Sequence, residues 1–64
     1  MLTDLEIKLA REVGKHKLSK DTAMGIFAFL EQENQQAEML RFLQDNRNAT
    51  EQEILVMLKN IITR

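Results

Sequence analysis

The sequence predicts an all-α protein, a compact bundle of four short helices that forms one small domain over residues 1–64. Proline is absent and only two glycines are present, whereas strands and hairpins are usually punctuated by these residues. Good helix formers such as Leu, Glu, Gln, Lys, Ala and Met are frequent along the chain. Apolar residues also recur at the spacing of a helix face, so we expect helices at about residues 3–14, 19–33, 35–45 and 50–63.

Hydroxyl-bearing residues mark three of the expected helix starts. Thr3 and Thr50 are each followed three positions later by a glutamate, Glu6 and Glu53 respectively, which is the pattern of a capping box. Ser19 is expected to cap the second helix, because its hydroxyl can accept a hydrogen bond from a free backbone N–H of the first turn. These three helices are therefore expected to begin at well-defined positions.

Each expected helix carries an apolar stripe, and the four stripes together are expected to form the core. In the first two helices the stripes contain Leu2, Leu5, Leu9, Val13, Ala23, Ile26, Phe27 and Leu30, with Phe29 widening the second. In the last two they contain Met39, Phe42, Leu43, Ile54, Leu55, Met57, Leu58, Ile61 and Ile62. Because the connections are short, neighbouring helices are expected to be antiparallel.

The segment from Phe29 to Asn46 contains two near-copies of one phrase, FLEQEN and FLQDN. At about 100° per residue, a continuous helix would place the apolar residues after Asn34 on the opposite side from those before it. A break near Glu33–Asn34 lets the second half fold back, so that both stripes face one core. Since the linking residues include neither glycine nor proline, one long bent helix over residues 19–45 stays open as the alternative.

The first helix is expected to end at Gly14, because glycine adopts the left-handed conformation of a helix end without steric cost. The single histidine, His16, follows between two lysines, so we expect a solvated side chain with no catalytic or pH-sensing role. One histidine and no cysteine cannot build a zinc site within the chain. We expect no metal and no cofactor.

The composition is that of an ordinary globular protein. An apolar fraction of 44% is too high for a disordered chain, and a net charge of −1 gives no general attraction to nucleic acid. The longest apolar run, Ala23–Leu30, is far shorter than the roughly 20 residues of a membrane helix. The first residues lack the basic and apolar regions of a signal peptide, so we expect a cytoplasmic protein without membrane association.

The sequence carries no motif for catalysis. A nucleophile motif, a glycine-rich phosphate loop and metal-ligand spacing are all missing. Four acids, Glu31, Glu33, Glu38 and Asp45, are spread along polar faces, whereas hydrolytic chemistry needs two carboxylates held together in a cleft. We therefore expect that the protein is not an enzyme.

The most informative residues are apolar ones that lie off the core stripes, namely Ile7, Met24, Ala28 and Val56. A chain of 64 residues buries only about 60% of its unfolded surface, so contact with another chain helps to stabilise it. These residues are therefore expected to bind a protein partner or a second copy, most simply as a dimer. This predicts a non-catalytic protein–protein interaction module, a small cytosolic regulator or adaptor that self-associates.

An alternative function is binding of nucleic acid or phosphate by the basic stretch Lys8, Arg11, Lys15, Lys17 and Lys20. No aromatic residue is interleaved for base stacking, and cations after a helix end also suit the helix dipole. Acidic residues before the third expected helix disfavour a helix-turn-helix, since they would repel phosphates. Nucleic acid is thus a possible but disfavoured partner.

The leucine-rich spacing with two capping boxes resembles small helical bundles of bacteria and phage in general. This likeness covers the whole chain and implies an all-helical fold without assigning a role to any residue. Ubiquitin-associated domains are similarly short and helical, but their characteristic loop is not matched, because Met24-Gly25-Ile26 lies inside an apolar helical run.

Overall fold

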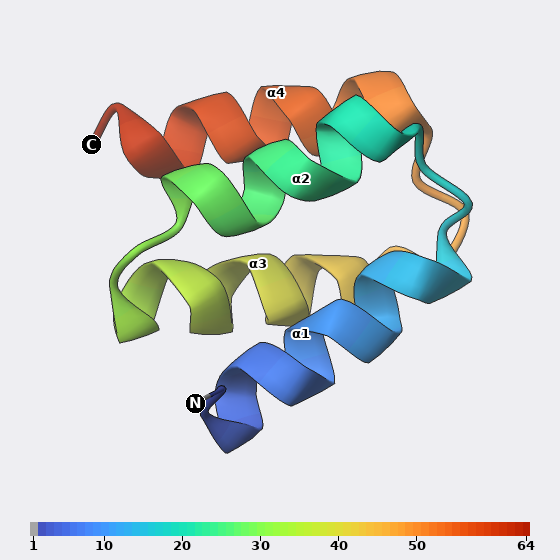
Figure 1. The fold of residues 1–64 in the computed structure, drawn as a ribbon. Helices are drawn as coiled ribbons and strands as arrows, with labels where there is room; N and C mark the ends of the chain where they lie inside the picture. Colours follow the sequence, from blue (N-terminus) through green and yellow to red (C-terminus); the bar gives the residue numbers. More distant parts are fainter. Residues whose placement is uncertain (1) are drawn as a thin grey trace.

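The computed structural model describes residues 2–64, which form four helices and no strand: α1 (Asp4–Lys15), α2 (Lys20–Phe29), α3 (Glu33–Asp45) and α4 (Glu51–Ile62) (Figure 1). The predicted all-α fold is confirmed. The Cα radius of gyration is 10.5 Å, close to the roughly 10.7 Å expected for a compact chain of this length. No helix within residues 2–64 is both long enough and apolar enough to cross a bilayer.

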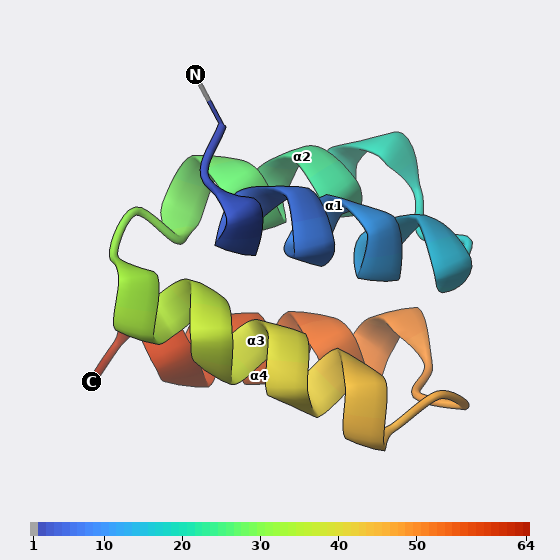
Figure 2. The same cartoon turned by 90° about the horizontal axis from the view of Figure 1, so that it is seen from below.

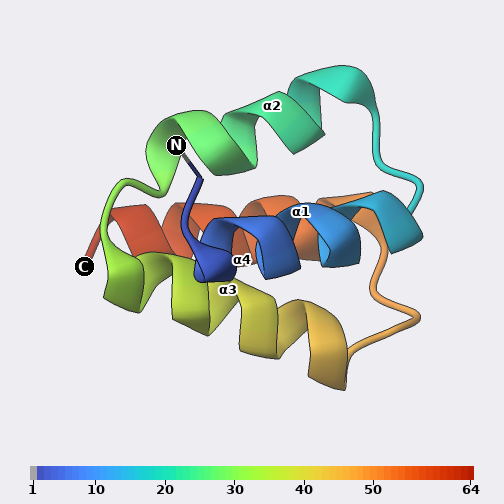
Figure 3. The same ribbon diagram turned by 60° about the horizontal axis from the view of Figure 1, so that its bottom comes forward.

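The chain reverses direction at each of its three connections. Figures 1, 2 and 3 place both termini and the α2–α3 connection at one end of the bundle, and the other two connections at the opposite end. α1 packs chiefly on α3, and α4 packs on both α3 and α2. The expectation that helices joined by short connections are antiparallel is confirmed for all three consecutive pairs. The packed pairs α1·α3 and α2·α4 are parallel, because alternate helices run the same way.

The three predicted hydroxyl caps are all present. The Thr3 hydroxyl accepts a hydrogen bond from the Glu6 N–H at 3.1 Å, and the Thr3 N–H donates to the Glu6 carboxylate at 3.0 Å. Thr50 and Glu53 repeat this box at 3.2 and 2.8 Å, and Ser19 caps α2. The backbone N–H of each capping threonine lowers the pKa of its glutamate, because it donates to the ionised carboxylate.

The segment Phe29–Asn46 contains two helices, as the phase of its apolar residues predicts. The chain folds back over Leu30–Gln32, however, and not at Glu33–Asn34, so α2 ends earlier and α3 begins earlier than expected. The Gln36 side chain lies at this position, where its amide donates a buried hydrogen bond of 2.8 Å to the Leu30 carbonyl. That bond satisfies a carbonyl at the end of α2 from within α3.

The predicted end of α1 at Gly14 is wrong. The helix continues to Lys15, and its C-cap is His16, whose N–H donates to the Val13 carbonyl. The left-handed backbone conformation falls on Lys17, with φ of 51°, although glycine would adopt it at lower cost. A glycine near a helix end is thus a weak marker of the final residue.

The core is formed by nine buried apolar side chains, which come from all four helices. They are Leu9, Val13, Ile26, Leu30, Met39, Leu43, Ile54, Leu58 and Ile61. Several residues predicted for the core are exposed instead, namely Leu2, Phe27, Phe29, Leu55 and Ile62. Short helices in a small bundle bury only a narrow stripe each, so the flanks of the predicted stripes stay at the surface.

Candidate functional site

Beyond its first three residues, helix α2 is apolar around its whole circumference. From Ala23 to Leu30 it contains no polar side chain, and only Ile26 and Leu30 of this run are buried. Four apolar residues of the run are exposed and are called here the α2 outer face: Met24, Phe27, Ala28 and Phe29. Met24 keeps 58% of its surface exposed, Phe27 40% and Phe29 59%.

The α2 outer face is broad. At about 100° per residue, its side chains and Gly25 cover roughly 200° of the helix circumference, opposite the buried stripe. The Phe29 ring covers Gly25, since a Cβ added there would lie 3.9 Å from the ring carbons. A helix that is apolar all round is normally buried in a core. In this chain it lies at the edge of the bundle, above the other three helices in Figure 3.

A polar cluster fixes the start of α2 on α4. The Glu51 carboxylate accepts hydrogen bonds from the Ser19 backbone N–H at 3.2 Å and from the Thr22 hydroxyl at 3.1 Å. These donors, the Ser19 backbone first, lower the pKa of Glu51, because they favour its ionised form. The α2 outer face is therefore presented by a helix with a fixed position.

The structure places the four predicted contact residues on three helices. Met24 and Ala28 lie one turn apart on the α2 outer face, while Ile7 is exposed on α1 and Val56 on α4. Sequence reasoning missed Phe27 and Phe29, which it assigned to the core. The unbroken apolar run Ala23–Leu30 is the signal that could have identified them.

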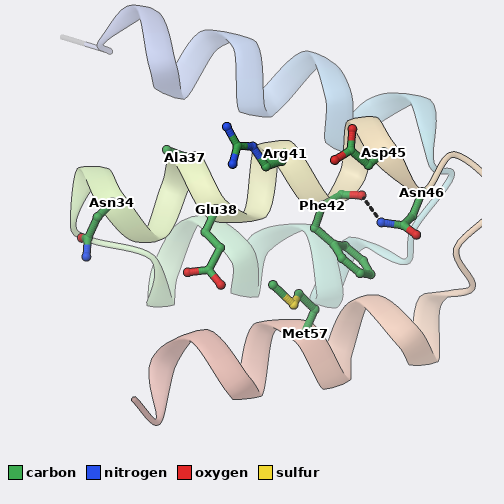
Figure 4. A pocket seen from close by; sticks show the side chains of 8 residues that line it. All are labelled: Asn34, Ala37, Glu38, Arg41, Phe42, Asp45, Asn46 and Met57. Atoms are coloured by element: carbon green, nitrogen blue, oxygen red, sulfur yellow. Dashed lines mark hydrogen bonds between the residues drawn. The ribbon is translucent and has the colours of Figure 1, made fainter.

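A shallow groove of about 710 Å³ runs between α3 and α4 (Figure 4). It is lined by Asn34, Ala37, Glu38, Arg41, Phe42, Asp45, Asn46 and Met57. In Figure 4 the Phe42 ring points from α3 towards Met57 on α4. Glu38 forms an ion pair with Arg64, and the Asn46 amide donates to the Phe42 carbonyl at 2.8 Å. Two of its polar side chains are thus already engaged within the chain.

A second hollow of about 340 Å³ adjoins this groove and contains Val56, which places that residue beside Phe42 and Met57. The acids Glu38 and Asp45 both line the larger groove, but Glu38 is paired with Arg64. Of the other two acids, Glu31 lies in the α2–α3 connection and Glu33 is the first residue of α3. The groove therefore holds no free pair of carboxylates of the kind that acid–base catalysis uses.

The residues of the basic stretch are exposed, but they lie on different elements and one of them is paired with an acid. Lys8, Arg11 and Lys15 share the outer side of α1, whereas Lys17 lies in the connection and Lys20 begins α2. The Lys15 ammonium lies 3.6 Å from the carboxylate of Glu12, which is buried. The Arg47 guanidinium, from the α3–α4 connection, lies 3.5 Å from the same carboxylate.

The expectation that the His16 side chain is solvated is wrong. Its side chain is half-buried, and Nε2 lies 3.1 Å from the Leu43 carbonyl oxygen. A carbonyl can only accept, so Nε2 carries the proton and donates. Nδ1 is buried without a hydrogen-bond partner. His16 thus joins the end of α1 to the end of α3, which is a structural role.

Neither metal-ligand geometry nor similarity identifies the protein. Among residues 2–64 no group of three or more His, Asp or Glu side chains is arranged to hold a metal ion. Comparison of the chain with protein-family models, curated proteins and solved structures finds no match. The apolar α2 outer face is therefore the feature on which a functional proposal rests.

Proposed function

We propose that this chain is a non-catalytic helical interaction module, a small cytosolic regulator or adaptor that self-associates through the α2 outer face. One observation carries the proposal: after its first three residues α2 has the composition of a buried helix, but it lies at the surface of the single chain. A second copy laid on this face would bury the side of α2 that the bundle leaves uncovered.

The size of the chain sets the expected strength of association. A standard interface buries about 800 Å² on each partner, which is roughly one-sixth of the 4666 Å² surface of this chain. The free energy lost in restricting the motion of two chains and in ordering their side chains offsets much of the free energy gained from such a contact. We therefore expect a weak dimer whose population depends on concentration.

Met24→Glu is expected to abolish self-association, because it places a charge in the centre of the α2 outer face. Sedimentation or light scattering from about 10 μM to about 1 mM, where weak complexes dissociate, measures the mass. The unmodified chain should rise from 7.5 kDa towards twice that value, while the variant stays at 7.5 kDa. Circular dichroism checks that the variant is folded.

Val56→Glu is the matched control. It makes the same type of exchange on α4, at a residue that is 52% exposed, close to the 58% of Met24. It should associate like the unmodified chain. An unmodified chain that stays monomeric at every concentration would refute the proposal, and so would equal loss of association in both variants.

A second candidate function is anion or nucleic-acid binding, which the alignment of Lys8, Arg11 and Lys15 on one side of α1 favours. The pairing of Lys15 with Glu12 and the net charge of −1 count against it. Retention on heparin distinguishes the two functions. A strict monomer that leaves heparin only at high salt would place this candidate first.

A further inference from the structure

The α2 outer face has a charge at each end. Lys20 precedes it at the first residue of α2, and Glu31 follows it just after the C-cap. Lys20 and Phe29, the first and last residues of α2, are roughly 14 Å apart along the helix, and Glu31 lies two residues beyond that end. Both side chains are exposed, and none of the ion pairs within residues 2–64 involves either of them.

Both charges have the wrong sign for their own helix. A helix start favours acids and a helix end favours bases, because of the helix dipole. Lys20 is a base at the start of α2, and Glu31 is an acid next to its end. Asp21 has the favoured sign, but it points about 100° away from Lys20 around the helix. Neither the helix dipole nor an ion pair within residues 2–64 therefore explains the signs of the charges at Lys20 and Glu31.

A second copy of α2 laid antiparallel on the first would give both charges a partner. Around a two-fold axis near the middle of α2, Lys20 of one copy faces Glu31 of the other, and the reverse pair forms at the opposite end. The same register places Met24 opposite Phe27, a favourable sulfur–aromatic pairing. Each charge also lies near the end of the opposite helix, whose dipole it complements.

We infer that the occupant of the α2 outer face is a second copy of this chain, docked antiparallel and held in register by two Lys20–Glu31 ion pairs. The inference rests on the proposed function and adds the partner and its orientation. A parallel arrangement would bring the two lysines together at one end and the two glutamates at the other. The other acids near the ends of α2 are Asp21, Glu33 and Glu51. Glu51 already accepts from Ser19 and Thr22 within its own chain, and neither Asp21 nor Glu33 replaces Glu31 in the antiparallel register.

Charge reversal tests this arrangement. Lys20→Glu and Glu31→Lys should each weaken self-association about tenfold or more, since two attractive contacts become repulsive. The double variant, Lys20→Glu with Glu31→Lys, should recover the affinity of the unmodified chain. An equimolar mixture of the two single variants should also form dimers, because opposite charges then meet at both ends.

Loss of folding in the single variants would not produce both weaker association of each variant and recovery in the double variant and the mixture. Each single variant gives α2 a charge of the sign that its own dipole favours, which offsets the repulsion that Lys20→Glu adds near Glu51, so both should stay folded. Circular dichroism at the sedimentation concentrations verifies this. High salt should weaken the unmodified dimer and strengthen self-association of each single variant, because it screens attraction and repulsion alike.

The outcomes separate the inference from the proposed function. If Met24→Glu dissociates the dimer but the charge variants keep the original affinity, the antiparallel register is wrong and the α2 contact stands. If the single variants dissociate but neither the mixture nor the double variant recovers, the two charges are not partners of each other. A monomeric unmodified chain overturns both proposals.

Discussion

Leu43→Ala is expected to lower the free energy of unfolding by about 2–5 kcal/mol, the usual cost of truncating a fully buried leucine. The Leu43 side chain lies in the core on α3, the helix that packs on both α1 and α4. Truncating this side chain leaves a cavity in the single core that all four helices share. A domain of this length has a total stability of roughly 3–10 kcal/mol, so the variant should be partly unfolded at room temperature.

Gln44→Ala provides the control for this prediction. Gln44 is the next residue of α3 and is exposed, so the exchange should change stability by less than about 0.5 kcal/mol. Urea unfolding followed by circular dichroism measures both variants. A loss below about 1 kcal/mol for Leu43→Ala would contradict the assignment of Leu43 to a close-packed core.

Gln36→Glu is expected to destabilise the chain by about 3 kcal/mol at neutral pH. Gln36 is only 7% exposed, and its amide donates to the Leu30 carbonyl where the chain folds back between α2 and α3. A carboxylate of the same shape cannot donate this bond. It also places a buried charge beside a carbonyl oxygen, which raises the cost above that of a missing hydrogen bond.

The matched exchange Gln44→Glu introduces the same charge on the exposed side of α3 and should have little effect. Urea midpoints of the two variants give the comparison. Equal stability would mean that other contacts fix the connection and that the Gln36 hydrogen bond does not.

The helix starts could be predicted from sequence because their determinants are local. Thr3, Ser19 and Thr50 each cap a helix through a hydrogen bond to a residue three positions away. The chain reversal could also be predicted, because it follows from the phase of the apolar residues. Its location could not, since the bond from Gln36 to the Leu30 carbonyl forms only after the chain has folded back.

The burial of residues at the edges of the predicted apolar stripes could not be predicted from sequence, because it depends on how the helices pack. Phe27 fits the predicted stripe of α2, but it lies at the margin that the bundle leaves exposed. His16 was predicted to be solvated from its charged neighbours, yet α3 supplies a carbonyl for its ring. Of the four contact residues predicted from sequence, Met24 and Ala28 lie on the α2 outer face, while Ile7 and Val56 lie on other helices, so the four do not form one surface.

Backbone amide NMR spectra over a dilution series test most directly whether α2 is the contact surface. Between about 1 mM and about 10 μM a weak dimer dissociates, and amides at the interface shift. We expect shifts concentrated in residues 20–31, with the outer side of α1 and the α3–α4 groove unchanged. Spectra that do not change with concentration, or shifts confined to α1 or to the groove, would contradict the account.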